Sequence, residues 1–189
     1  SIRLAFHIGN IPFEDERWAF PEFGQKRGTL RFNALPVMTI DGAQVTQSNA
    51  LNRYVGRLAG LYPQDALQAL YCDEALDAVE DIGHQLGRTF GLKGDAMRDA
   101  REALVKGPLT CLLKGLDQLL TRGGGQYFAD ERLTVADLKV FVQVRALTAG
   151  YLDHIPTTFV QELTPALAAH CARIGEHPRI AAYYASRKR

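Results

Sequence analysis

The sequence predicts an α/β unit followed by an all-α unit, and two observations carry this prediction. In the first third of the chain, two short apolar runs, Val37 to Ile40 and Gln44 to Thr46, flank Asp41-Gly42. That dipeptide supplies the positive φ angles of a tight hairpin turn. After about residue 63, apolar residues repeat at three- and four-residue steps and give no strand signal. We therefore expect a boundary near residue 62.

The residues before the hairpin predict a short helix and an extended segment. Apolar residues recur at helical spacing between Ser1 and Gly9, and a glycine suits the end of a helix. The alternating run from Phe13 to Trp18 predicts an exposed edge strand.

The two ends of the hairpin offer groups to a ligand. A cis bond before Pro36 would turn the chain sharply and leave the Leu35 N–H and C=O facing outward, where an extended peptide can pair with them. Ser48 stands at the N-cap of the next helix, whose first N–H groups and dipole attract a carboxylate. The pattern suits a small anionic peptide, but it also suits an ordinary proline turn and an ordinary cap.

The helical unit is predicted to include several long helices. Their expected bounds are Gln64 to Leu86, Ala96 to Leu120 with a kink at Pro108, Val135 to Leu147, and Pro165 to Gly175. Thr134 and Asp137 form a capping box at the start of the third, with Asp in the usual place of Glu or Gln. We interpret Asp137 as a structural residue.

Composition excludes several classes of partner. The chain has 189 residues, of which 47% are hydrophobic and 23% charged, with a net charge of +1. This predicts a globular protein that binds no nucleic acid. No apolar run is long enough for a membrane span and no signal peptide is visible, so we expect a cytoplasmic protein without a membrane partner. Cys72, Cys111 and Cys171 lack metal-ligand spacing and are expected to be reduced thiols.

A group of acidic residues, Asp77, Glu80 and Asp81, lies in the second half of the first long helix. Asp77 and Asp81 share one face of the helix, and two acids so placed could form a metal site or an acid–base pair. No neighbouring residue completes a coordination set, and a solvated face explains the same pattern. We therefore predict no metal.

The stretch from Phe32 to Leu58 resembles the glutathione-binding core of the cytosolic glutathione transferases. That family has a cis-proline after Val, Ile or Leu, a hairpin with Asp-Gly, and Gln-Ser at a helix start. Here these are Leu35-Pro36, Asp41-Gly42 and Gln47-Ser48, followed by the similar sequence NALNRY. The resemblance continues with LTVAD at residues 133–137 and HPRI at residues 177–180.

The resemblance implies a thioredoxin-like domain over residues 1–62 and an all-α domain over residues 63–189. It places Ser1 inside the family's first helix, so the family's first strand is missing and we expect the sequence to be a fragment. In the family, a Tyr, Ser or Cys at the end of that strand holds glutathione as its thiolate. We therefore assign no catalytic residue.

The resemblance also implies a set of glutathione-binding residues. In the loop before the proline turn, residues 20–27, the family has an aromatic side chain that packs on the peptide and a basic one that pairs with its glycine carboxylate. Phe20, or as the second choice Trp18, stands near the aromatic position, and Lys26 or Arg27 near the basic one. Asp81 would reach across a dimer interface to the amino group of the peptide. The implied residues are Phe20, Lys26, Arg27, Leu35, Pro36, Gln47, Ser48 and Asp81.

The function implied is a glutathione transferase, closest to the sigma-like class, that conjugates the glutathione thiolate to small hydrophobic electrophiles. Glutathione is then a co-substrate, no metal is needed, and a homodimer is expected. Three alternatives stay open: a glutathione-dependent isomerase of the prostaglandin synthase type, a non-catalytic binding protein of the same fold, and a fragment without function.

Overall fold

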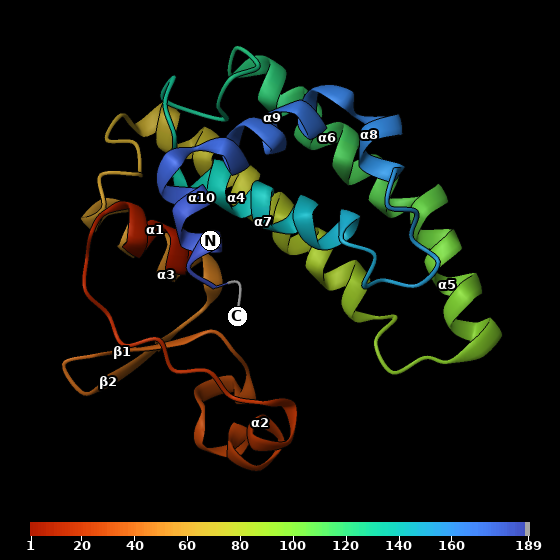
Figure 1. Cartoon of the computed structure of the whole chain (residues 1–189), viewed down its shortest axis with the longest axis horizontal. Helices are drawn as coiled ribbons and strands as arrows, with labels where there is room; N and C mark the ends of the chain where they lie inside the picture. The colour runs from red at the N-terminus through yellow and green to blue at the C-terminus, as the bar shows by residue number, and fades with distance from the viewer. Residues whose placement is uncertain (188–189) are drawn as a thin grey trace.

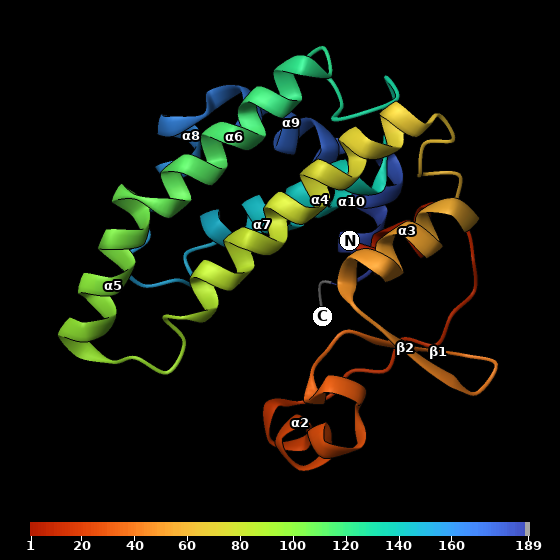
Figure 2. The same cartoon turned by 180° about the vertical axis from the view of Figure 1, so that it is seen from behind.

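The first part of the chain combines short helices with one hairpin. The computed structural model describes residues 1–187 (Figure 1). In chain order this part contains α1 (Ile2–Ile8), α2 (Phe20–Lys26), the 3-10 turns η1 (Arg27–Thr29) and η2 (Arg31–Asn33), β1 (Val37–Ile40), β2 (Ala43–Thr46) and α3 (Ser48–Leu58). In Figure 2, α2 and the 3-10 turns form a small lobe apart from the helical core.

In the second part, all regular secondary structure of the described residues is helical. It contains α4 (Ala66–Gly87), α5 (Gly94–Lys106), α6 (Pro108–Arg122), α7 (Val135–Thr148), α8 (Phe159–Leu163), α9 (Pro165–Glu176) and α10 (Pro178–Ala185). Among residues 1–187, no helix has both the length and the apolar character needed to cross a bilayer.

The predicted hairpin is confirmed. β1 and β2 pair antiparallel, with Val37 opposite Thr46 and Ile40 opposite Ala43. Asp41 and Gly42 have φ angles of 49° and 79°, the positive values that a two-residue hairpin turn requires. The peptide bond before Pro36 is cis.

Helix α7 is the centre of the hydrophobic core. It packs against α4 and α9 and lies in the middle of the helical part in Figure 1. Its residues from Val135 to Phe141 are all buried, because a helix that is apolar around most of its circumference needs neighbours on every side. Two charged residues, Asp137 and Lys139, lie within this buried stretch.

The end of α3 docks on the start of α7. The Val135 N–H donates to the Leu61 carbonyl over 2.9 Å. A Cβ added at Gly56 would lie 2.8 Å from a Val135 methyl group, so only glycine permits this close approach. These contacts fix α3, and the hairpin before it, against the helical core.

The predicted edge strand from Phe13 to Trp18 is wrong. Residues 11–19 have no regular secondary structure. A strand needs a partner for its backbone groups, and no strand lies beside this segment in residues 1–187. Side chains hold it instead: Phe13 stacks on Phe6 at 4.6 Å between ring centroids, and Asp15 pairs with Arg3 and Arg187.

Two other expectations also need correction. The loop expected around residues 20–27 contains helix α2, which has Pro21 in its first turn, where proline is tolerated. The single kinked helix expected from Ala96 to Leu120 is two helices. Gly107 leaves the helical region with φ −122° and ψ −101°, and Pro108 then starts α6.

Candidate functional site

A cavity of about 120 Å³ lies where the proline turn meets the start of α3. The hairpin creates this meeting point, because pairing Val37 with Thr46 brings the residues before β1 beside the residues after β2. The lining residues are Arg31, Phe32, Ala34, Leu35, Pro36, Thr46, Gln47, Ser48 and Glu80.

Four predicted site residues meet at this cavity: Leu35, Pro36, Gln47 and Ser48. The expected N-cap is shifted by one residue. Gln47, with φ 73° and ψ 111°, is the N-cap residue, and Ser48 is the first residue of α3. The chain turns at Gln47, so the Ser48 hydroxyl does not cap its own helix but donates a hydrogen bond to the Glu80 carboxylate.

The other four predicted residues do not line the cavity. Phe20 lies on α2 with 91% of its surface exposed. Lys26 pairs with Glu22 over 2.7 Å, and Arg27 is exposed in η1. Asp81 is exposed on α4, next to the cavity residue Glu80. The roles assigned to these four residues stay predictions.

A buried lysine stands behind the cavity. The Lys139 ammonium donates to the Ser48 hydroxyl over 3.1 Å, and it also donates to the Asn49 side-chain carbonyl and the Glu80 carboxylate. The Lys139 side chain is 10% exposed and that of Glu80 is 37% exposed. The three donors of the ammonium group are therefore all in use, and they join α3, α4 and α7.

Burial and charge act against each other in this cluster. Burial lowers the pKa of Lys139, while the Glu80 carboxylate opposes that shift. Burial acts to raise the pKa of Glu80, but the hydrogen bonds from Lys139 and Ser48 outweigh it and the pKa is lowered. Glu80 is consequently an anion near neutral pH.

Four polar residues of this site were not predicted as site residues from the sequence: Arg31, Thr46, Glu80 and Lys139. Lys139 carried a usable signal, because it is a single cation within the apolar run VADLKVFV. A lysine in a buried helix needs an acidic partner. Glu80 was noticed only as a member of the acidic group on α4, and nothing in the sequence marked Arg31 or Thr46.

Of the acidic group, Asp77 also has partners in the fold. It accepts a hydrogen bond from Asn49 and lies 3.6 Å from the Arg53 guanidinium. Within residues 1–187, no group of three or more His, Cys, Asp or Glu side chains is arranged to hold a metal ion.

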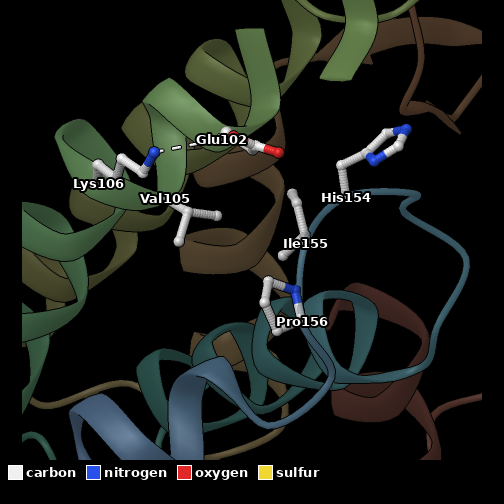
Figure 3. Close-up of a pocket in the computed structure, with 6 residues that line it drawn as sticks. All are labelled: Glu102, Val105, Lys106, His154, Ile155 and Pro156. Atoms are coloured by element: carbon white, nitrogen blue, oxygen red, sulfur yellow. Dashed lines mark ion pairs between the residues drawn. The ribbon is translucent and has the colours of Figure 1, made fainter. Parts of the chain in front are cut away.

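A second cavity lies between α5 and the loop before α8. Its volume is about 470 Å³, and Figure 3 shows its lining residues. Val105, Ile155 and Pro156 are apolar, while Lys106 pairs with Glu102 over 3.7 Å. None of the predicted site residues lines this cavity. The functional argument therefore rests on the first cavity.

Comparisons with known proteins agree with the resemblance in the sequence. A family model described as "Glutathione S-transferase, C-terminal domain" matches residues 80–187, more than half of the chain. Glutathione S-transferase 3 of Caenorhabditis elegans is 30% identical over 143 residues, covering 73% of this chain and 69% of the relative.

Solved structures share the fold. Prostaglandin synthase D of Nilaparvata lugens superposes with a TM-score of 0.86 at 23% identity, covering 100% of this chain and 92% of the other. A sigma class glutathione transferase of Fasciola hepatica gives 0.84 at 19% identity, covering 100% and 90%. The predicted fold class, a thioredoxin-like part followed by a helical part, is confirmed. The chain belongs to the glutathione S-transferase family.

Proposed function

We propose that the protein is a glutathione transferase that joins the glutathione thiolate to small hydrophobic electrophiles, closest to the sigma-like class. One observation carries the proposal: in a chain of this family, the proline turn and the Gln47-Ser48 helix start line the same cavity. Extended backbone lies on one side of that cavity and the positive end of α3 on the other. This combination suits a peptide that ends in a carboxylate.

The cavity would hold one end of glutathione. Leu35 would pair with the cysteinyl backbone, and Ser48 with the first amides of α3 would bind the γ-glutamyl carboxylate. A volume of about 120 Å³ is too small to enclose the whole tripeptide, so the glycine end would extend into solvent. Arg31, an exposed cation that lines the cavity, would pair with the glycine carboxylate.

The proposed function also implies a domain arrangement and an oligomeric state. Residues 1–62 would form the glutathione-binding domain and residues 63–189 the helical domain, whose last two residues lie outside the described part. The protein would form a cytoplasmic homodimer, with no nucleic acid or membrane partner. Asp81 would then face the peptide bound to the other protomer. Phe20 with Lys26 or Arg27 would approach the glycine end.

The chemistry is a nucleophilic substitution or addition. The sulfur of the bound thiolate attacks an electrophilic carbon, a C–S bond forms, and the leaving group departs with the electron pair of the broken bond. Thiolate formation needs a hydrogen-bond donor and a positive field near the sulfur. We assign the donor to none of the residues described above.

An isomerase is the second candidate. The observation that favours it is the fold shared with a prostaglandin synthase, at a TM-score of 0.86. Such an enzyme would use bound glutathione without consuming it. A binding protein of the same fold would take up glutathione and catalyse neither reaction.

One assay separates the three candidates. The protein is incubated with glutathione and an activated aryl halide, and the thioether product is measured against the uncatalysed rate. A transferase gives a saturable rate that Ser48→Ala reduces. A prostaglandin endoperoxide offered in place of the halide identifies an isomerase by rearrangement with glutathione recovered intact. Binding of glutathione without turnover of either substrate would overturn both enzymatic functions.

A further inference from the structure

The cluster behind the cavity carries an inference about how the γ-glutamyl end of glutathione is recognised. Glu80 lines the cavity, is 37% exposed and belongs to the same protomer as Ser48. A carboxylate offers about four lone-pair sites, and Glu80 receives donors from both Ser48 and Lys139. Its exposed part leaves room for a further donor from the cavity.

The γ-glutamyl end of glutathione is a zwitterion, with an α-ammonium and an α-carboxylate on one carbon. A site for it must place an anion and a donor close together. Glu80 and Ser48 meet this requirement, because the Ser48 hydroxyl is hydrogen-bonded to the Glu80 carboxylate. In the structure the hydroxyl hydrogen is directed at Glu80, so it is not available to a second acceptor.

Resting on the proposed function, we propose that Glu80 binds the α-ammonium of glutathione and that the buried Lys139 is a positioning residue that directs the Ser48 hydroxyl toward the α-carboxylate. The ligand ammonium replaces the hydroxyl as a donor to Glu80. The hydroxyl then rotates to the ligand carboxylate and keeps accepting from Lys139 over 3.1 Å. A hydroxyl that accepts from a cation is a stronger donor, since such bonds polarise one another.

Lys139 has a second effect on the same carboxylate. Without its charge, the Glu80 anion would stand unneutralised beside the subsite for the ligand carboxylate. The two carboxylates would repel each other, and the repulsion is strong where water is partly excluded. Lys139 therefore both strengthens the Ser48 donor and removes the repulsion.

The test pairs protein variants with peptide variants. The ligands are glutathione, glutaryl-Cys-Gly, which lacks the α-ammonium, and 4-aminobutanoyl-Cys-Gly, which lacks the α-carboxylate. Dissociation constants are measured by calorimetry for the unmodified protein, Glu80→Gln, Lys139→Met, Lys139→Arg and Ser48→Ala. Matched controls are Glu74→Gln, on the same helix but paired with Arg122, and Lys114→Met, exposed on α6.

Glu80→Gln should weaken glutathione binding about 10-fold, the size expected for a lost hydrogen bond to a charged group. It should change glutaryl-Cys-Gly binding less than about twofold, because that peptide has no ammonium to lose. Equal weakening of both peptides, or no weakening of either, would overturn the role of Glu80. Thermal unfolding of each variant shows whether the fold is kept.

Lys139→Met should weaken glutathione and glutaryl-Cys-Gly about 10-fold and leave 4-aminobutanoyl-Cys-Gly within about twofold. Lys139→Arg should restore part of the affinity. In the Ser48→Ala background, Lys139→Met should weaken glutathione binding less than it does in the unmodified protein, because both substitutions act through the Ser48 hydroxyl. If the effects of Ser48→Ala and Lys139→Met on the binding free energy add, or if Lys139→Met weakens all three peptides equally, Lys139 has only a structural role.

The outcomes separate this inference from the function on which it rests. If the unmodified protein fails to bind glutathione, the proposed function fails and the inference with it. If the unmodified protein binds glutathione but each variant weakens all three peptides equally, the function stands and the inference is overturned.

Discussion

Helix α7 carries two buried polar networks, and they differ in whether they are closed. At its start, Asp137 accepts hydrogen bonds from the Thr134 amide and hydroxyl, the Phe128 amide and the ring of His170, over 2.8 to 3.1 Å. The side chains of Asp137 and His170 are fully buried. All of the partners of Asp137 are protein groups, so this network can stabilise the fold but has no access to a ligand.

The second network, two residues further along α7, opens to the cavity. Lys139 is nearly as buried as Asp137, but its partners Ser48 and Glu80 line the cavity. Buried polar groups cost stability unless they are paired, so both networks are satisfied inside the protein. Burial alone therefore does not separate a structural charge from a functional one. The two kinds of charge differ in their partners. The partners of a functional charge line a cavity and can form hydrogen bonds with a ligand, whereas those of a structural charge cannot.

The largest predicted effect is on the closed network. Asp137→Ala removes the acceptor of four hydrogen bonds and leaves buried donors unsatisfied, so it should lower the free energy of unfolding by about 4 kcal/mol or more. Urea unfolding followed by circular dichroism measures this. Thr134→Ala removes only the hydroxyl cap and should cost about 1 kcal/mol. Similar costs for the two substitutions would contradict a network centred on Asp137.

The open network should depend less on its charge for stability. Lys139→Met keeps most of the apolar stem and leaves a partly exposed Glu80 carboxylate that water can reach, so the loss should stay within about 1.5 kcal/mol. The same urea experiment measures it. A loss as large as that of Asp137→Ala would mean that Lys139 also serves mainly to hold the fold together.

Acid should affect the open network in a defined direction. The pKa of Glu80 in the folded protein lies below its ordinary value of 4.5 because of Lys139 and Ser48. The folded state therefore gains stability from Glu80 above pH about 4.5 and loses it as the pH falls through the lowered pKa. Between pH 7 and pH 3, the free energy of unfolding should fall more steeply for the unmodified protein than for Glu80→Gln. Parallel curves would contradict an ionised, paired Glu80.

The smallest effect is expected for an exposed pair on α2. Lys26 pairs with Glu22 over 2.7 Å, four residues apart, with both side chains solvated. Lys26→Ala should change the free energy of unfolding by about 0.5 kcal/mol or less. The glutathione dissociation constant of the same variant tests the predicted role of Lys26 at the glycine end. An unchanged constant would remove Lys26 from the proposed site.

The sequence predicted the capping box of the closed network, but neither the bonds of Asp137 to Phe128 and His170 nor the open network. The reason is separation along the chain. Thr134 and Asp137 are three residues apart, so the capping box is a local pattern. Ser48, Glu80 and Lys139 come from three helices, and only the tertiary fold brings them together. The proline turn and the Gln47-Ser48 helix start were predictable because a hairpin, which is itself local, joins them.

The failures of sequence reasoning have two causes, a missing tertiary partner and a local backbone break. The alternation from Phe13 to Trp18 fits a strand, but a strand forms only beside a partner. The break between α5 and α6 depends on Gly107 leaving the helical region just before Pro108, and the apolar spacing of the flanking residues does not reveal it. Local patterns thus predicted the hairpin, the capping box at Thr134 and most of the helices, while the segment from Phe13 to Trp18 depended on a partner that the pattern does not contain.

Calorimetric titration shows whether the cavity between the proline turn and α3 binds glutathione. Glutathione is titrated into the unmodified protein and into Ser48→Ala. We expect saturable binding of one peptide per chain, weakened about 10-fold by the substitution, because a hydrogen bond to a carboxylate is lost. Absence of saturable binding to the unmodified protein, or equal affinity in the two proteins, would contradict binding at this cavity.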